Sequence, residues 1–409
     1  MCYSVESIEL SEFDTITGVS LSNLDFRYLT EHHNKHLLVE KSGNRYTLKS
    51  RAYVGKIKLK EKVINIRTKV QIANLYYMLT YAYNLGKFDE FENNDEIKNL
   101  SLYELLVTIL LKWIEHSIKK GLYRSYESKT ELLSGVKGKI LVGNFGKCKG
   151  KTTCQYHELT YSIPENRILK GTLFHLIRQS LPNELKQKCI RYIRIMGDIQ
   201  NLELSQRVFS QINYHRLNYN YMKIIELCRL IFESSFLDTV ENNVVFSSYM
   251  VNMNRLFELF LANRIKENFK NVSAPGRRDN WAEGDKSILP SIFPDILIKD
   301  KLIIDAKYYK SVLNERGKLH SANLYQILCY MAVINRDGIL IYPEQDRHFE
   351  ERFLFNDKCF WILTIPLYGS FDNMISGVER VISKIGNIIG QTETSTIASI
   401  DKLTADSLN

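Results

Sequence analysis

The sequence predicts a mixed α+β protein with a β-rich N-terminal region, a helical middle and a C-terminal α/β core. Three observations predict this class. In residues 1–70, apolar and charged residues alternate between turn signals, as in β-hairpins. From residue 71 the apolar period lengthens to that of a helix. After residue 246, helical stretches alternate with short β-rich runs, which is typical of a sheet flanked by helices.

The composition is that of a globular protein. The chain has 409 residues, of which 44% are hydrophobic and 25% are charged, with Gly 20 and Pro 7. This balance excludes a collagen-like or linker-dominated chain, and the length predicts roughly two or three domains. Lys+Arg 55 against Asp+Glu 46 gives a net charge of +9, which permits a polyanionic partner without requiring one.

The sequence shows no targeting or membrane signal. No stretch reaches the roughly 18 uncharged apolar residues of a membrane helix, and the N-terminus lacks the apolar core of a signal peptide. We therefore expect a cytoplasmic protein without a membrane partner. The seven cysteines are scattered, which favours reduced thiols. Cys148, Cys154 and His157 match no common zinc spacing, so we expect no structural zinc there.

Two hairpins are expected in the N-terminal region. Residues 37–40 and 45–49 flank Ser42-Gly43-Asn44, a turn sequence that tolerates positive φ. A second hairpin follows in residues 54–70, where lysines alternate with apolar residues on the first strand. The basic face of this hairpin fits either a solvated outer surface or a surface that binds nucleic acid or a partner.

Residues 71–245 are expected to be mainly helical. One long amphipathic helix carries an apolar stripe formed by Leu102, Leu105, Leu106, Ile109, Leu110, Trp113 and Ile114. Other helices are expected at 73–85, after Pro164 and at 217–235. The Gly- and Lys-rich segment near 135–160 predicts a strand and an exposed loop inserted between them.

The loop contains Gly150-Lys151-Thr152, but it is not a phosphate-binding loop. Such a loop needs a glycine five positions before Gly150, where this chain has Phe145. If a nucleotide is used, another subunit should bind it. The remaining boundaries place a C-terminal domain at 246–390 and a Ser-, Thr- and Ala-rich tail, expected to be disordered, at 391–409.

The segment 293–310 carries the candidate chemistry. Two β-rich runs, 293–298 and 302–307, are joined by Lys299-Asp300-Lys301, so we expect a hairpin that places Asp295 opposite Asp305. Opposed residues have Cβ atoms roughly 5 Å apart, close enough for both carboxylates to bind one hard divalent cation. Lys307 lies two residues after Asp305 and points to the same face.

Two adjacent carboxylates repel each other unless a cation relieves the repulsion, so this geometry predicts Mg²⁺. With a metal to polarise a phosphate oxygen and Lys307 to orient the nucleophile, the site has what phosphodiester hydrolysis needs. We therefore interpret Asp295, Asp305 and Lys307, together with the preceding Pro294, as a PD-(D/E)xK nuclease core with a restriction-endonuclease-like α/β fold. An ordinary surface hairpin with a carboxylate–lysine pair is the other interpretation of the motif.

Flanking residues extend the candidate site. Glu258 lies about 100° from Phe257 on an amphipathic helix, at the border of its apolar stripe, and is a candidate metal ligand. Gln326 and Tyr330 are at i and i+4 of an expected helix and share a face, where they could position Lys307 or a DNA phosphate. Candidate phosphate contacts in the loop before the hairpin are Arg277, Arg278 and Lys286.

The sequence as a whole resembles the McrC family, the nuclease subunits of McrBC-type modification-dependent restriction systems. The resemblance covers residues 50–345 and departs from the family at 67–69, where a usual Pro-Lys is replaced by Arg-Thr-Lys. It rests on Val54-Gly55 with INIRTK, NLYYMLTYAY (74–83), LYELL leading to GLYRSYES (121–128), GVKGKI (135–140), PENRILKGTL (164–173) and LFELFLANRI.

The resemblance implies a two-part protein. The N-terminal part would dock onto a hexameric AAA+ GTPase resembling McrB, insert into its ring and stimulate GTP hydrolysis. The C-terminal part would cut DNA, with Asp295, Asp305 and Lys307 as catalytic residues and Mg²⁺ as the cofactor. GTP and the modified base would be bound by the partner, not by this chain.

Two alternatives remain open at the level of sequence. Gln-x3-Tyr after the core also occurs in RecB-like nucleases, so the chain could be a self-sufficient repair nuclease that cuts without a motor. A non-catalytic adaptor or GTPase activator is the third reading, in which the carboxylates are structural. The intact triad of Asp295, Asp305 and Lys307 argues against the adaptor.

Overall fold

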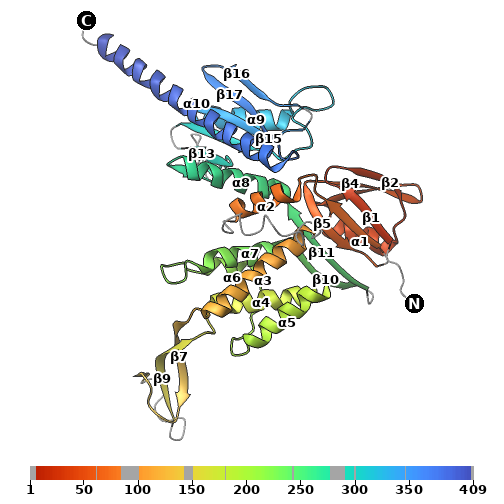
Figure 1. Cartoon of the computed structure of the whole chain (residues 1–409), viewed down its shortest axis with the longest axis vertical. Helices are drawn as coiled ribbons and strands as arrows, with labels where there is room; N and C mark the ends of the chain where they lie inside the picture. The colour runs from red at the N-terminus through yellow and green to blue at the C-terminus, as the bar shows by residue number, and fades with distance from the viewer. Residues whose placement is uncertain are drawn as a thin grey trace, which may run out of the picture. The chain divides into compact units, whose positions relative to one another are not determined.

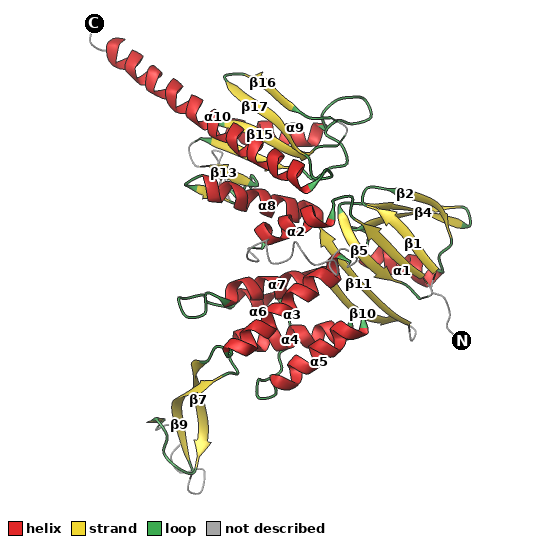
Figure 2. Cartoon of the chain, viewed as in Figure 1, coloured by secondary structure: helices red, strands yellow, loops and turns green. Residues whose placement is uncertain are grey.

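The computed structural model describes residues 6–60, 62–83, 101–141, 151–179, 181–241, 244–276, 291–298, 301–345 and 347–406, and for 236–247 and 391–406 it describes no side chains. These residues form helices and several separate sheets, so the expected mixed α+β class is confirmed (Figures 1 and 2). None of the described helices is long and apolar enough to span a membrane.

The chain forms two compact units. Unit 1 consists of Met1–Lys56, Glu61–Lys98 and Met250–Asn409, and unit 2 of Ile57–Lys60 and Asn99–Tyr249. Helix α2 (Ile72–Ala82), which the sequence groups with the helical middle, belongs to unit 1. It packs there against α8 (Met253–Asn268), where Asn263 Nδ2 donates to the carbonyl of Tyr81 at 2.8 Å.

The N-terminal part of unit 1 contains the first expected hairpin. Strands β3 (Leu37–Ser42) and β4 (Arg45–Ser50) pair antiparallel with Ser42 opposite Arg45, and β2 (Thr15–Val19) flanks β4. The second expected strand pair is β5 (Tyr53–Lys58) beside β6 (Lys62–Arg67), whose other neighbour is the parallel strand β1 (Glu6–Ser11).

A helix that the sequence analysis did not include, α1 (Asn23–His32), follows β2. Its start is fixed by a capping box. The Ser22 hydroxyl accepts a hydrogen bond from the Asp25 backbone N–H, and the Asp25 carboxylate accepts one from the Ser22 backbone N–H. Ser22-x-x-Asp25 was the sequence signal for this helix. The N-terminal region is therefore β-rich, as expected, but it also contains one helix that was not predicted.

A pair of buried histidines follows α1. His33 and His36 are almost fully buried, their Nδ1 atoms lie 3.1 Å apart, and His33 Nε2 lies 3.2 Å from the Tyr28 hydroxyl. Burial lowers the pKa of each ring to about 3, and His36 contributes further to the lowering at His33. Both rings are therefore neutral in the folded protein at neutral pH.

The folded protein should lose stability as the pH falls below 6.5. Unfolded histidine has a pKa of about 6.5, so the unfolded chain binds protons that the folded chain excludes, at about 1.4 kcal/mol per histidine for each pH unit. The stabilisation is complete above pH 6.5 and is lost as the pH falls toward 3. We expect urea unfolding at pH 5.5 and 7.5 to show this loss.

The His36→Gln variant should show a weaker pH dependence of the unfolding free energy than the wild type. His32→Gln is the comparison variant, because His32 is exposed on the last turn of α1, and it should change the pH dependence less than His36→Gln does. Equal slopes for all three proteins would contradict the assignment of the pH dependence to the buried pair.

The C-terminal part of unit 1 is built on a six-stranded sheet. Its strand order is β12-β13-β14-β15-β17-β16, with β14, β15 and β17 parallel and the outer strands antiparallel. The strands are β12 (Val272–Ser273), β13 (Ile296–Ile298), β14 (Leu302–Ala306), β15 (Asp337–Pro343), β16 (Glu350–Phe355) and β17 (Lys358–Ile365).

Helix α9 (Ser321–Ile334) connects β14 to β15 and covers one face of this sheet. Its Ile327 and Met331 pack against Leu297, Ile303 and Leu340 in one buried cluster. Side chains alternate along a strand, so Asp305 lies on the same face as Ile303. The sheet therefore presents Asp305 to the layer formed by α9.

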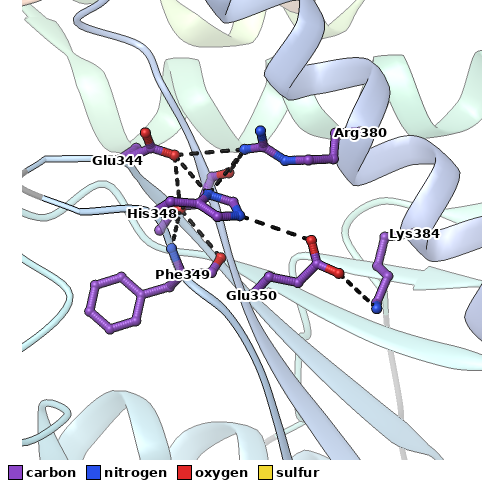
Figure 3. Close-up of polar contacts among 7 residues, drawn as sticks. Glu344, His348, Phe349, Glu350, Arg380 and Lys384 are labelled. Carbon is purple, nitrogen blue, oxygen red and sulfur yellow. Dashed lines mark hydrogen bonds and ion pairs between the residues drawn. The ribbon is translucent and has the colours of Figure 1, made fainter.

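Helix α10 (Phe371–Asp406) packs against β17, and a polar cluster ties it to the sheet (Figure 3). Glu344 Oε2 lies 2.9 Å from His348 Nδ1 and 3.6 Å from a guanidinium nitrogen of Arg380. Lys384 forms a 2.8 Å ion pair with Glu350 of β16. The helix includes the backbone of 391–406, and the disorder that the sequence predicts for 391–409 stays a prediction.

Unit 2 has a helical body with a β-hairpin. Helix α3 carries the predicted apolar stripe, whose Leu105, Leu106 and Ile109 are fully buried. The long hairpin of β7 and β9 extends away from the helices of this unit (Figure 2). The sequence predicts only one strand and an exposed loop here, near 135–160. The elements are α3 (Leu102–Lys120), β7 (Ser125–Leu133), β8 (Lys139–Ile140), β9 (Thr152–Thr160), α4 (Pro164–Arg178), α5 (Asn183–Ile195), α6 (Gln206–Ser210), α7 (Tyr221–Ser234), β10 (Ser235–Glu241) and β11 (Val244–Asn252), the last continuing into unit 1.

Candidate active site

The hairpin that carries the candidate site has the expected register. Ile296 pairs with Ile304, Leu297 with Ile303 and Ile298 with Leu302. Continuing this register by one residue places Asp295 opposite Asp305. The first strand begins at Ile296, three residues later than expected, and Pro294, which has no backbone N–H to give to a ladder, lies just before it.

Asp295 is fixed by the opposite strand. Its Oδ2 accepts a hydrogen bond from the backbone N–H of Ala306 at 2.8 Å. The bond joins the residue before β13 to the last residue of β14. The two carboxylates are therefore held together by the hairpin backbone itself.

Asp305 is the most constrained member of the site. Its side chain is 0% exposed, and among the described residues neither carboxylate oxygen receives a hydrogen bond of normal geometry. Burial, and next the negative charge of Asp295, raise the pKa of Asp305 to about 7, against the lowering effect of Lys307. A carboxylate in this setting is costly unless a cation compensates it.

Lys307 supplies part of that compensation. Its Nζ lies 2.8 Å from Asp305 Oδ2, and its side chain is 15% exposed. The charges of Asp305 and Asp295 raise the pKa of Lys307, although burial acts in the opposite direction. The lysine is therefore held charged beside the carboxylate pair, as predicted from its spacing.

Glu258 of α8 is half-buried and within electrostatic range of the pair. Burial, and next the charge of Asp295, raise its pKa, while Arg255, 3.6 Å away, and Lys307 lower it. In the described part of the chain, no three His, Cys, Asp or Glu side chains are arranged to hold a metal ion together. Direct metal binding by Glu258 stays a prediction.

Gln326 and Tyr330 of α9 share a face, as predicted, and they bind each other and the segment before Asp295. Gln326 Nε2 donates to the Tyr330 hydroxyl at 2.8 Å, and that hydroxyl donates to the carbonyl of Phe293 at 3.2 Å. The pKa of Tyr330 is raised by burial and by the charges of Asp305 and Asp295. The pair thus acts on the backbone that leads into Asp295. Whether it contacts DNA stays a prediction.

Some predicted residues fall outside the described part of the chain. These are Arg277, Arg278 and Lys286, the expected DNA contacts, and Cys148 of the rejected zinc group. Conversely, the structure brings Glu12 into contact with Tyr308, the residue after Lys307, and the sequence analysis named neither. No local signal could have found this pair, because the two residues are 296 positions apart.

The donor set of the site fits a hard divalent cation. Asp295 keeps one oxygen beyond its bond to Ala306, and both oxygens of Asp305 lack well-formed hydrogen bonds from described residues. Mg²⁺ takes oxygen ligands, commonly one or two carboxylates with water and substrate phosphate completing the shell. The two carboxylates therefore match the protein's usual share of such a site.

The fold and the site define a mixed α+β protein in which a buried carboxylate, a second carboxylate on the neighbouring strand and a lysine meet at the end of a parallel strand. The family model described as McrBC 5-methylcytosine restriction system component matches residues 48–343. The chain belongs to this family, which confirms the resemblance drawn from its motifs.

Two known proteins show how far the similarity extends. The type IV methyl-directed restriction enzyme EcoKMcrBC of Escherichia coli K12 is 28% identical over 323 residues, covering 73% of this chain and 93% of that protein. A solved half-complex of Thermococcus gammatolerans McrB AAA+ hexamers with bound McrC is 18% identical to this chain, with a TM-score of 0.58. That match covers 93% of this chain and 100% of the solved chain and shows a shared fold.

Proposed function

We propose that this chain is the Mg²⁺-dependent DNA endonuclease subunit of a GTP-driven, McrBC-like restriction complex, with a PD-(D/E)xK nuclease core at 246–390. The observation that carries the proposal is Asp305, a fully buried carboxylate beside Asp295 and 2.8 Å from Lys307. A purely structural role would favour a neutral residue at this position, because burial and the neighbouring charge of Asp295 both disfavour a carboxylate there.

The chemistry follows from these side chains. Asp295 and Asp305 would hold Mg²⁺, which when bound would supply Lewis-acid polarisation of the scissile phosphate. Lys307 would orient the attacking water and stabilise the negative charge that develops on the phosphate. Gln326 and Tyr330 would keep Asp295 in place through the carbonyl of Phe293.

We further propose a hexameric AAA+ GTPase resembling McrB as the partner, which binds GTP and reads the modified base. Family membership supports this assignment, as does the likeness in fold to McrC bound to McrB hexamers. Residues 71–245 would supply docking surface and stimulate the GTPase. Within this range, the β7–β9 hairpin exposes several apolar side chains, as expected of a surface that a partner covers: Tyr126 is 67% exposed, and Leu132 and Leu159 are each 45% exposed.

The test is cleavage of methylated and unmethylated plasmid DNA by the purified chain, alone and with the partner GTPase, GTP and Mg²⁺. We expect cutting only in the complete mixture, and loss of cutting when EDTA removes the metal. We also expect this chain to raise the GTPase rate of the partner in the absence of DNA cleavage.

The alternatives give different results. Robust cutting by the chain alone would establish a self-sufficient nuclease and exclude the motor-dependent one. Stimulation of the GTPase without any cutting, under conditions in which the partner binds the methylated DNA, would establish an adaptor and overturn the nuclease proposal.

A further inference from the structure

Tyr308 directly follows Lys307 and anchors the end of the strand that carries the candidate site. Its side chain is 2% exposed, and its ring lies 6.0 Å from that of Phe13 and 5.9 Å from that of Phe257. Phe257 precedes Glu258 on α8. Tyr308 therefore contacts both the N-terminal region and the helix that carries the outer carboxylate of the site.

Glu12, at the end of β1, binds the Tyr308 hydroxyl from the N-terminal region. Glu12 is 0% exposed, and its Oε1 accepts hydrogen bonds from the Tyr308 hydroxyl at 2.8 Å, from the Lys69 backbone N–H at 2.8 Å and from Thr68 Oγ1 at 3.2 Å. No described group hydrogen-bonds its Oε2. One carboxyl oxygen thus accepts three hydrogen bonds, two from the N-terminal part of unit 1 and one from its C-terminal part.

A buried carboxyl group is an expensive way to hold an apolar interface together. Burial raises the pKa of Glu12, and the nearby ammonium of Lys69 is in an ion pair with Asp14 at 3.3 Å. An apolar residue would fill the same space without the desolvation cost. Unlike an apolar contact, the hydrogen bond of the carboxyl group is directional, so it fixes the position of the Tyr308 hydroxyl.

The backbone alone holds Lys307 weakly. Strand β14 ends at Ala306, and the ladder to β15 continues by a single bond from the Lys307 N–H to the carbonyl of Ile341 at 2.9 Å. Beyond that bond the chain leaves the sheet. The side chain of Tyr308 is therefore the next fixed point after Lys307.

We propose that the Glu12–Tyr308 hydrogen bond is a positioning contact of the nuclease site. Through this bond, the sheet that contains β1 holds Lys307 in position beside Asp305. The proposal rests on the nuclease function proposed above. Glu12 touches neither substrate nor metal and acts through Tyr308. The N-terminal region is thus part of the catalytic architecture as well as a candidate docking surface.

The test measures kcat and KM for plasmid cleavage by the complete complex with Glu12→Ala, Tyr308→Phe and the double variant. A misplaced lysine should lower kcat by about 10- to 100-fold and leave KM unchanged. The double variant should be no slower than the slower single variant, because Glu12→Ala already removes the hydrogen bond that Tyr308→Phe removes. Glu12→Gln, which keeps the acceptor oxygen, should restore most of the rate.

Glu9→Ala is the matched control, since Glu9 is on the same strand but on its exposed side, and it should cut at the wild-type rate. Stimulation of the partner GTPase reports on the fold of each variant. Wild-type kcat in Tyr308→Phe, or additive losses in the double variant, would overturn the positioning role while wild-type cleavage still supports the nuclease. Failure of the wild type itself to cut would overturn the function on which the inference rests.

Discussion

Replacing Asp305 with asparagine should abolish DNA cleavage and at the same time stabilise the metal-free chain above pH 7. Cleavage by the complete complex should fall on the order of 10³-fold, more than the 10- to 100-fold typical of residues that only support metal ligands. Asparagine has the shape of aspartate but no charge to hold Mg²⁺ or to pair with Lys307. Initial rates with methylated plasmid measure this loss.

The stability effect follows from the sign of the pKa shift. Burial and Asp295 raise the pKa of Asp305 to about 7 in the folded chain, whereas an unfolded aspartate has a pKa of about 3.9. The folded chain therefore binds the proton more tightly, and stability falls as the pH rises from about 4 through 7. At pH 8 the asparagine variant should be more stable by about 1 kcal/mol or more, and at pH 4 the difference should disappear.

Metal binding provides a second readout that needs no DNA. Millimolar Mg²⁺ should raise the Tm of the wild type, because a ligand that binds only the folded state stabilises it, and should leave the variant unchanged. Asp357→Asn is the matched control, since the Asp357 side chain is 82% exposed in the turn before β17. A destabilised Asp305→Asn variant at pH 8 would mean that the carboxylate is a structural partner of Lys307.

Replacing Lys307 with methionine should also abolish cleavage but should destabilise the metal-free chain. Methionine keeps the length of the side chain and removes the ammonium that lies 2.8 Å from Asp305 Oδ2. We expect cleavage to fall by about 10²- to 10³-fold through loss of charge stabilisation in the transition state. At pH 8 the buried carboxylate of Asp305 loses its compensating charge, so unfolding in urea should require less denaturant.

Both variants thus lose activity, but their stabilities change in opposite directions. Lys310→Met is the control for Lys307→Met, because Lys310 is exposed three residues further along the same segment. If Lys307→Met were stable at pH 8 and still cut DNA, the lysine would neither compensate the charge of Asp305 nor take part in cleavage.

The core of the candidate site was predictable because it is local in sequence. Alternation along two short strands sets the register that pairs Leu297 with Ile303, and this register brings Asp295 to Asp305. The spacing of two residues places Lys307 on the same face. The i, i+4 spacing likewise predicts that Gln326 and Tyr330 share a face, where the structure joins them by a hydrogen bond of 2.8 Å.

The misses have physical reasons too. Helix α1 was overlooked because its capping box lies between strong strand signals. The strand partners β7 and β9 are separated by 18 residues, from Leu133 to Thr152, so no tight turn marks them as a pair. The burial that gives His33 and His36 their lowered pKa values was also invisible in a segment of mixed polarity.

The sequence by itself determined the mixed class, the main helices, the hairpin register and the carboxylate–lysine group, because each depends on a period or a spacing within about twenty residues. The tertiary structure alone decided that α2 packs with α8 in unit 1 and that Glu12 binds Tyr308. It also decided how deeply Asp305 is buried, and hence how its pKa is raised. These properties arise when segments far apart in the chain exclude water from one another, and no local pattern records that exclusion.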